Sequence, residues 1–142
     1  MRTFLNFLLV AVATTLCVGC GENEVEPTLV GCWQLEGFGV DDVFIPIADN
    51  RKECYSFVVG TESSEGAYRC GEGKASANQI RLFFYIDSLR IGSTKIYEDI
   101  EDAIIFMDLY DQMNRYEFSQ NKLKLYSADS TKKYLMYHRI SN

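Results

Sequence analysis

Short runs of alternating apolar side chains constrain the fold of this chain more than any other feature. In the clearest run, residues 79–86, the side chains of Ile80, Leu82, Phe84 and Ile86 share one face. An alternation of period two over four to eight residues is typical of a β-strand that packs on a core. Tyrosine and phenylalanine each occur nine times, a bias that also favours strands. We therefore expect a mainly β protein.

Turn residues divide the chain after residue 28 into several runs of this kind. The expected strands cover residues 29–35, 52–59, 65–70, 79–86, 92–97, 116–118, 123–126 and 134–140. About eight short antiparallel strands predict a small β-barrel or a strongly curved sheet. The large side chains expected inside it are Trp33, Tyr55, Phe57, Phe84, Phe106 and Tyr116.

One segment, residues 98–113, changes period and predicts the single α-helix of the fold. Its apolar stripe consists of Ile100, Ala103, Ile104, Met107 and Tyr110, widened by Phe106, Leu109 and Met113. Acidic residues crowd its first turn, where the positive end of the helix dipole favours them. We expect this helix to pack against the core.

The first 19 residues are expected to be a signal peptide and not part of the fold. Arg2 carries one positive charge and residues 4–18 are almost wholly apolar. This stretch is too short to span a bilayer comfortably, which takes about 20 residues. Gly19 directly precedes Cys20, an arrangement that resembles the lipobox of bacterial lipoproteins, in which the cysteine is acylated. A plain secretory signal or a short membrane anchor is the alternative.

Cys20 and the residues up to 28 are expected to form an acidic tether, and residues 29–142 the folded domain. Buried acyl chains contribute about 0.8 kcal/mol per methylene, so several chains hold a protein on a membrane. Gly21 follows Cys20 where an inner-membrane retention signal would carry aspartate. We therefore expect attachment to the bacterial outer membrane, facing either the periplasm or the cell surface.

The charge balance excludes one class of partner. Acidic residues outnumber basic ones by 20 to 14, the formal net charge is −6, and the chain has no basic run. A nucleic-acid-binding protein needs a face rich in Lys and Arg, so we expect no nucleic-acid partner. The length of 142 residues and the 47% hydrophobic content fit one compact domain.

The sequence Gly-Cys-Trp-Gln-Leu at residues 31–35 resembles the Gly-x-Trp-x-Leu opening of META domains of the HslJ type and of lipocalin-like bacterial lipoproteins. Ser-Thr-Lys-Ile at residues 93–96 resembles a further META step, Ser-Thr-Lys-Met. The family's helix and next strand pair are matched at Phe106, Tyr110, Met113, Tyr116, Leu123 and Leu125. The resemblance covers about residues 29–139.

This resemblance implies a structural core and no catalytic residue. The implied core residues are Gly31, Trp33, Leu35, Phe106, Tyr110, Tyr116, Leu123 and Leu125. The chain departs from the family between residues 60 and 78, where no Asn follows Cys70 and no clear Gly-x-Tyr step comes next. The strand register there is accordingly open.

Three cysteines remain outside the signal peptide and the lipidation site, namely Cys32, Cys54 and Cys70. Disulfides persist in exported proteins. Folding the intervening segment as a symmetric hairpin places Val59 opposite Glu65 and Cys54 opposite Cys70, with Cα atoms about 4.5–5.5 Å apart. A Cys54–Cys70 disulfide is therefore expected. Two buried thiols are the alternative.

No group of residues predicts catalysis or metal binding. His138 is the only histidine, and with Cys54 and Cys70 it would make a poor zinc site. The acidic pair 41–42 and the acids at the start of the helix are typical of solvated faces. The apolar residues 43–47 are expected to form a loop over one end of the barrel. We expect no metal, no cofactor and no enzymatic activity.

The expected function is a non-enzymatic interaction or structural role in the cell envelope. In this interpretation a surface patch binds another envelope component. The alternative is a lipocalin-like carrier whose barrel holds a small apolar ligand. Large interior side chains favour the first, and an empty pocket above about 300 Å³ inside the barrel would favour the second.

Overall fold

The computed structural model describes residues 27–61 and 66–142. The expected signal peptide, Cys20 and nearly all of the tether lie outside the described residues. The strands are β1 (Gly31–Val40), β2 (Val43–Pro46), β3 (Tyr55–Val59), β4 (Arg69–Ala75), β5 (Asn78–Phe84), β6 (Leu89–Ser93), β7 (Arg115–Phe118), β8 (Lys122–Ser127) and β9 (Ser130–Ser141). The helices are the 3₁₀-helix η1 (Asp49–Cys54) and the α-helix α2 (Glu101–Tyr110).

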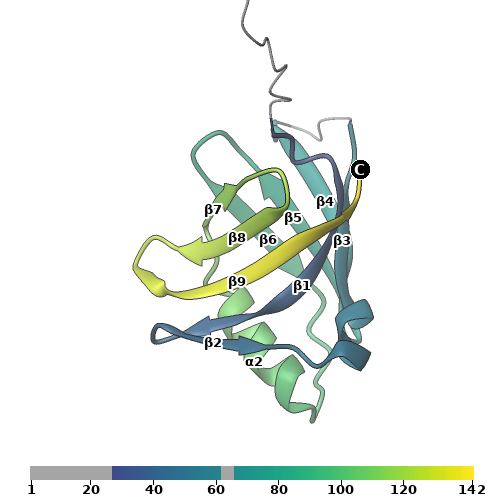
Figure 1. Ribbon diagram of the computed structural model, residues 1–142, viewed down its shortest axis with the longest axis vertical. Helices are drawn as coiled ribbons and strands as arrows, with labels where there is room; N and C mark the ends of the chain where they lie inside the picture. The colour runs from purple at the N-terminus through teal and green to yellow at the C-terminus, as the bar shows by residue number, and fades with distance from the viewer. Residues whose placement is uncertain (1–26, 62–65) are drawn as a thin grey trace, which may run out of the picture.

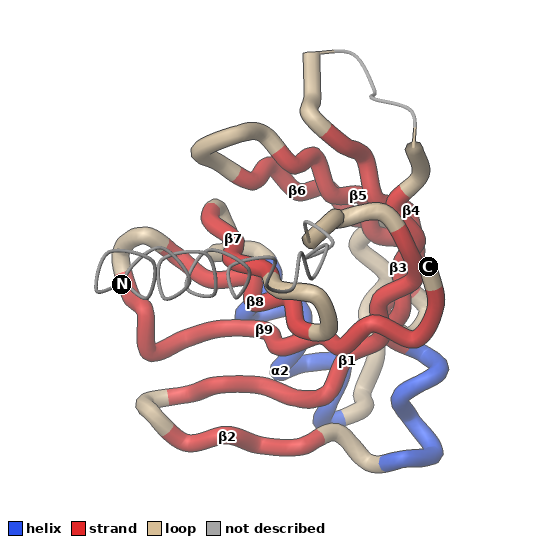
Figure 2. The backbone as a smooth tube through the Cα atoms, turned by 45° about the horizontal axis from the view of Figure 1, so that its top comes forward, coloured by secondary structure: helices blue, strands red, loops and turns tan. Residues whose placement is uncertain are grey.

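The expectation of a mainly β fold with one α-helix is confirmed. The strands form one antiparallel sheet in the order β6-β5-β4-β3-β1-β9-β8-β7, with β2 attached to the other half of β1, and it is nearly closed as a barrel (Figures 1 and 2). The segment with α2 joins the end strands β6 and β7. The Tyr110 hydroxyl donates toward the Arg81 and Gly92 carbonyls at 3.0 Å, so α2 is fixed to this end of the sheet.

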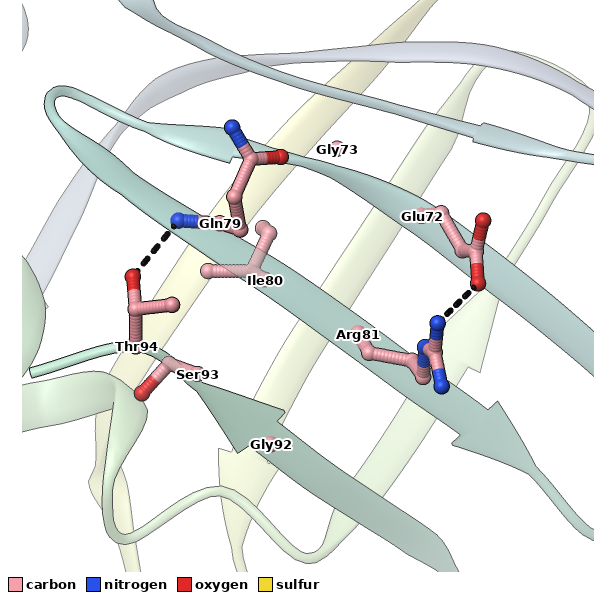
Figure 3. A pocket seen from close by; sticks show the side chains of 8 residues that line it. All are labelled: Glu72, Gly73, Gln79, Ile80, Arg81, Gly92, Ser93 and Thr94. Carbon is pink, nitrogen blue, oxygen red and sulfur yellow. Dashed lines mark hydrogen bonds and ion pairs between the residues drawn. The ribbon is translucent and has the colours of Figure 1, made fainter.

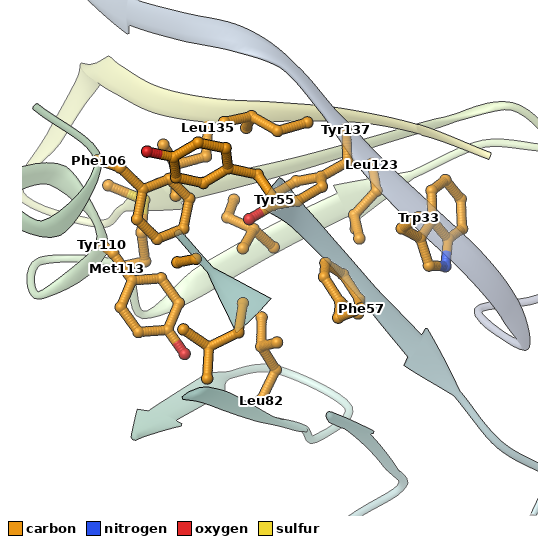
Figure 4. Close-up of a cluster of buried hydrophobic side chains, with 14 of the residues drawn as sticks. Trp33, Tyr55, Phe57, Leu82, Phe106, Tyr110, Met113, Leu123, Leu135 and Tyr137 are labelled. Carbon is orange, nitrogen blue, oxygen red and sulfur yellow. The ribbon is translucent and has the colours of Figure 1, made fainter. Parts of the chain in front are cut away.

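Aromatic side chains fill the interior of the barrel (Figure 4). The ring centroid of Phe57 lies 4.9 Å from that of Tyr137, and the rings of Tyr55 and Phe106 lie 5.0 Å apart. Such pairs contribute about 0.5–1.5 kcal/mol each beyond their burial. Of the core residues implied by the family resemblance, Tyr116 is half-buried, and the fully or almost fully buried ones are Gly31, Trp33, Leu35, Phe106, Tyr110, Leu123 and Leu125.

Strand β4 departs most from the sequence prediction, which placed the partner of β3 at residues 65–70. Val59 lies opposite Gly71, and Phe57 lies opposite Gly73. A Cβ added to Gly73 would lie 2.5 Å from the Phe57 Cα and 2.6 Å from its Cβ. The Ser56 carbonyl oxygen would lie closer still, at 2.0 Å, so the backbone of β3 leaves no room for a side chain at this position. A glycine-rich segment that has the composition of a loop is therefore a strand.

Helix α2 is shorter than the expected 98–113, and its buried face is rotated. Ile100 and Ile104, two members of the expected inward stripe, are 41% and 50% exposed. The buried face consists of Ala103, Phe106, Leu109 and Tyr110. A helix that is apolar nearly all round does not reveal from its periodicity which side packs. Within residues 27–61 and 66–142 no helix is long and apolar enough to cross a membrane.

Residues 43–47 are not the loop that the sequence suggested. Residues 43–46 form the edge strand β2, joined to β1 by a tight turn at Asp41 and Asp42, whose φ angles are 50° and 68°. Two successive residues in the left-handed region characterise the type I′ turn that suits β-hairpins, and aspartate tolerates that region well. The run was missed because β2 is exposed on both faces and therefore lacks a polar alternation.

Two buried tyrosines make a matched test of the core. The Tyr137 hydroxyl is buried without a hydrogen-bond partner among the described residues, whereas Tyr110 uses its hydroxyl. An unsatisfied buried group costs about 1–3 kcal/mol, and a typical hydrogen bond contributes about 1 kcal/mol. We expect Tyr137→Phe to raise the free energy of unfolding by about 1 kcal/mol and Tyr110→Phe to lower it by about as much. Urea unfolding measures both, and equal losses in the two variants would contradict the assignment.

Candidate functional site

An apolar groove lies between β2 and the start of α2, at the end of the barrel away from the point where residue 27 enters it (Figure 1). Its volume is about 330 Å³. Its apolar wall is formed by Phe38, Ile45, Ile47, Ile100 and Ile105. We call it the β2–α2 groove. A concave, mainly apolar surface of this size is typical of binding sites.

The strand β2 supplies one wall and leaves one of its edges open. Among the described strands it pairs with β1 alone, and the Ile47 N–H donates to the Glu36 carbonyl at 2.9 Å. Ladder bonds alternate along an antiparallel pair, so the main-chain groups of Phe44 and Pro46 point away from β1. Because Pro46 has no N–H, this edge offers two carbonyl acceptors and one donor.

Large apolar side chains on β2 and at the start of α2 remain exposed. Ile100 lines the groove, and Ile104 lies one turn further along the helix. Val43 and Phe44 are exposed on β2, where Phe44 points to the face opposite Ile45. On the other side of Ile104 lies a second hollow of about 210 Å³, bounded also by Tyr97. Exposed apolar patches on a protein that also has a well-filled core mark interaction sites.

A half-buried ion pair forms the polar end of the groove. The Arg51 Nε donates to Asp102 Oδ2 at 2.9 Å and its Nη2 to Oδ1 at 3.2 Å, with the side chains 25% and 18% exposed. Nη2 also donates to the Ser76 hydroxyl, which donates to Glu98 at 2.5 Å. Burial raises the pKa of the Tyr55 phenol beside this pair, and the Asp102 carboxylate adds to the rise. The network fixes α2 to η1 and the β4–β5 turn.

The outer surface of α2 is strongly acidic. Between residues 96 and 111 the chain has six acidic and no basic side chains. Asp102 is neutralised by Arg51, and Asp111 accepts from Lys95 at 2.6 Å. Among the described residues, Asp99, Glu101 and Asp108 have no ion-pair partner. Of these three, Glu101 lines the groove, so the acidic rim formed by residues on and beside α2 begins with an unpaired charge at the groove itself.

Another depression of about 430 Å³ lies on the outer face of β4, β5 and β6 (Figure 3). Glu72 and Arg81 form an ion pair of 2.8 Å across it, and the Gln79 N–H donates to the Thr94 hydroxyl at 2.9 Å. These polar groups thus satisfy one another, and the hollow is open to solvent. The β2–α2 groove is the better candidate, because its lining is apolar and its rim carries unpaired charge.

The expected Cys54–Cys70 disulfide is wrong. Cys54 precedes β3, and its carbonyl accepts from the Ser76 N–H beyond the far end of β4. Cys70 lies opposite Phe83 near the start of β4, so six strand residues, or about 20 Å, separate the two positions. The symmetric hairpin failed because the connection between β3 and β4 is longer than the short loop assumed. Cys32 is half-buried on β1, next to Trp33.

His138 lies on β9, and its Nδ1 is 3.7 Å from Glu36 Oε1, too far for a hydrogen bond. It is not brought together with Cys54 or Cys70. In the part of the chain that the structure describes, no group of three or more His, Cys, Asp and Glu side chains is arranged to hold a metal ion. Asp41 and Asp42 occupy the β1–β2 turn.

Sequence reasoning missed the groove because its walls come from segments more than fifty residues apart. Two signals were nevertheless present, the apolar run at residues 43–47 and the excess of apolar residues around the helix. Arg51 carried no signal, because its role depends on Asp102, which is distant in the sequence and adjacent in space.

No family model and no curated protein matches this chain. Two solved structures are similar. A DUF4847 family protein from Bacteroides vulgatus has 13% sequence identity and a TM-score of 0.52, over 79% of this chain and 94% of that one. A protein from Burkholderia xenovorans has 12% identity and a TM-score of 0.50, over 77% of this chain and 81% of that one. At these identities the likeness concerns the fold alone. The barrel shares its architecture with these two proteins.

Proposed function

We propose that this protein is a lipid-anchored component of the bacterial outer membrane that binds another envelope protein through the β2–α2 groove, without catalysis. The observation that carries the proposal is the exposure of Ile100 and Ile104 beside an apolar groove, on a barrel whose interior is filled. Anchoring is proposed from the Gly19-Cys20 lipobox.

The filled interior favours an interaction role over transport of a ligand inside the barrel. Trp33, Tyr55, Phe57 and Tyr137 all have 1% exposure or less. We also propose that the chain is related to META and lipocalin-like domains. In this proposal it is a small envelope barrel with a filled interior, which binds through its surface. The second candidate is a carrier of a small apolar ligand, and it is favoured by the groove volume of about 330 Å³, which is within the range of ligand pockets.

Ile100 provides a variant that separates binding from stability. It is the N-cap residue of α2, with φ −123° and ψ 125° and no side-chain cap. Aspartate at such a position accepts from the first free N–H groups of a helix and contributes about 0.5–2 kcal/mol. We expect Ile100→Asp to fold at least as stably as the wild type, as measured by urea unfolding, while placing a charge in the apolar groove.

The test is site-specific photocrosslinking in cells, with the reactive residue in place of Ile104 or, as a control, of Gln79 on the outer sheet. We expect one discrete protein adduct from position 104 and none from 79. Ile100→Asp should abolish that adduct. Ile86→Asp adds the same charge at a site that is 83% exposed in the β5–β6 loop, and it should leave the adduct unchanged. A small-molecule adduct would support the carrier, and equal adducts from both positions would contradict a docking groove.

A further inference from the structure

We infer that the β2–α2 groove receives an extended, cationic and apolar segment of its partner, which lies along the open edge of β2. The inference rests on the proposed function, because it specifies the chemistry of the partner that the groove binds. Three independent features of the described residues converge on it: the main-chain edge, the charge of the rim and the spacing of the apolar lining.

The open edge of β2 favours a partner with main-chain donors. Phe44 offers one N–H and one C=O, whereas Pro46 offers only a C=O. A peptide strand added here gains main-chain hydrogen bonds, as in other complexes formed by strand addition. This edge of β2 has two acceptors and one donor. The partner therefore donates more main-chain hydrogen bonds to β2 than it accepts from it.

The rim favours positive charge in the partner. Asp99, Glu101 and Asp108 are exposed on or beside α2 without an ion-pair partner among the described residues. Arg51, the one cation among the described residues of the groove lining, is held by both carboxylate oxygens of Asp102. A segment with Lys or Arg thus meets unpaired carboxylates, and within that lining it meets no unpaired cation.

The lining favours apolar side chains at every second position. In a strand, alternate residues point to one face. Phe38 and Ile45 are paired across the hairpin and face α2, where Ile100 and Ile105 complete the wall. A strand beside β2 therefore places one set of side chains into the groove, beside α2 and Glu101, and the other set on the opposite face.

A second copy of this chain fits the groove poorly. A twofold contact brings the same surface patch together from both copies. The exposed carboxylates of Asp99, Glu101 and Asp108 would then oppose one another, and like charges across an interface cost binding energy. A cationic partner avoids this repulsion.

The experiment uses fluorescence anisotropy with the protein and a blocked heptapeptide of alternating Leu and Lys. We expect saturable binding that weakens as salt is raised, and much weaker binding of the Leu–Glu peptide. Removing two rim charges with Asp99→Asn and Glu101→Gln should weaken binding about threefold to tenfold. The control pair Asp87→Asn and Glu117→Gln removes the same charge elsewhere and should leave binding unchanged.

Two further peptides and one measurement complete the test. Two further Leu–Lys peptides are methylated on alternate main-chain nitrogens, one on the odd-numbered and one on the even-numbered residues. Only one of these sets of N–H groups faces β2. One peptide should therefore bind at least tenfold more weakly than the unmethylated peptide, and the other should bind as well as it does. Equal binding by the Leu–Lys and Leu–Glu peptides, or equal losses in the rim and control variants, would overturn the inference. The inference would also be overturned if the wild type sedimented as a dimer and the Ile100→Asp variant sedimented as a monomer. A crosslinked partner at position 104 that the Leu–Lys peptide fails to displace would overturn this inference alone and leave the proposed function standing.

Discussion

Trp33→Ala is expected to lower the free energy of unfolding by about 3–5 kcal/mol, the usual cost of removing a large buried aromatic side chain. Trp33 is 0% exposed, its indole N–H donates to the Leu29 carbonyl at 2.9 Å, and the Arg139 guanidinium lies 4.3 Å from the ring centroid. Arg139 also donates to the carbonyls of Thr28 and Val30. The indole therefore holds the entry of the chain and the last strand together.

Domains of this size have a total stability of about 5–15 kcal/mol, so the alanine variant should lose a large part of it and melt at a clearly lower temperature. Thermal melting and urea unfolding measure the effect. Trp33→Phe retains most of the packing and should lose less. Tyr97→Ala removes an aromatic ring that is 85% exposed, and it should change the stability by less than about 0.5 kcal/mol. An unchanged melting temperature for Trp33→Ala would show that the indole does not hold the core.

Cys20→Ser is expected to release the protein from the membrane fraction almost completely. The physical reason is that attachment through several acyl chains depends on one sulfur atom, and each buried methylene contributes about 0.8 kcal/mol. The folded domain should be unaffected, because its strands and helices are formed by residues 31–141. Cell fractionation measures whether each protein is in the membrane fraction. The intact mass of the wild-type protein measures whether lipid has been added.

Cys17, which lies in the expected signal peptide, supplies the control. Cys17→Ser alters the same apolar segment but leaves the Gly19-Cys20 step intact, so this variant should remain in the membrane fraction with the lipid mass present. A wild-type protein without added lipid mass would reject acylation. Retention of Cys20→Ser in the membrane would point to an uncleaved anchor segment.

Sequence reasoning correctly placed the strands in which one face is buried and the other is exposed to solvent. Ile80, Leu82 and Phe84 are 3% exposed or less, and the strand ends before Ile86, which is 83% exposed. The strands that it missed or misplaced lack this contrast. In β4 glycines replace the apolar residues, and at Gly73 the backbone of Ser56 and Phe57 leaves no room for a side chain.

The candidate site was less accessible to sequence reasoning than the fold. Periodicity reports that a segment has an apolar face, but it does not report whether another element covers that face. Ile100 and Ile104 belong to the same stripe as Ala103, yet they are 41% and 50% exposed whereas Ala103 is 3% exposed. The Arg51–Asp102 pair requires contacts across the barrel end, which no local pattern encodes.

The pairing of β1 with β9 has a consequence for how the protein is made. Cys32 lies opposite Ser141 and Gly39 opposite Tyr134, so the first strand of the barrel rests on the last. Closing contacts of such long sequence separation is slow, because the loop entropy is lost before the contacts form. A chain emerging from the ribosome cannot complete this sheet until β9 has been synthesised. The complete sheet can therefore form only when synthesis is nearly finished, and until then the first strand lacks the neighbour along one of its two edges.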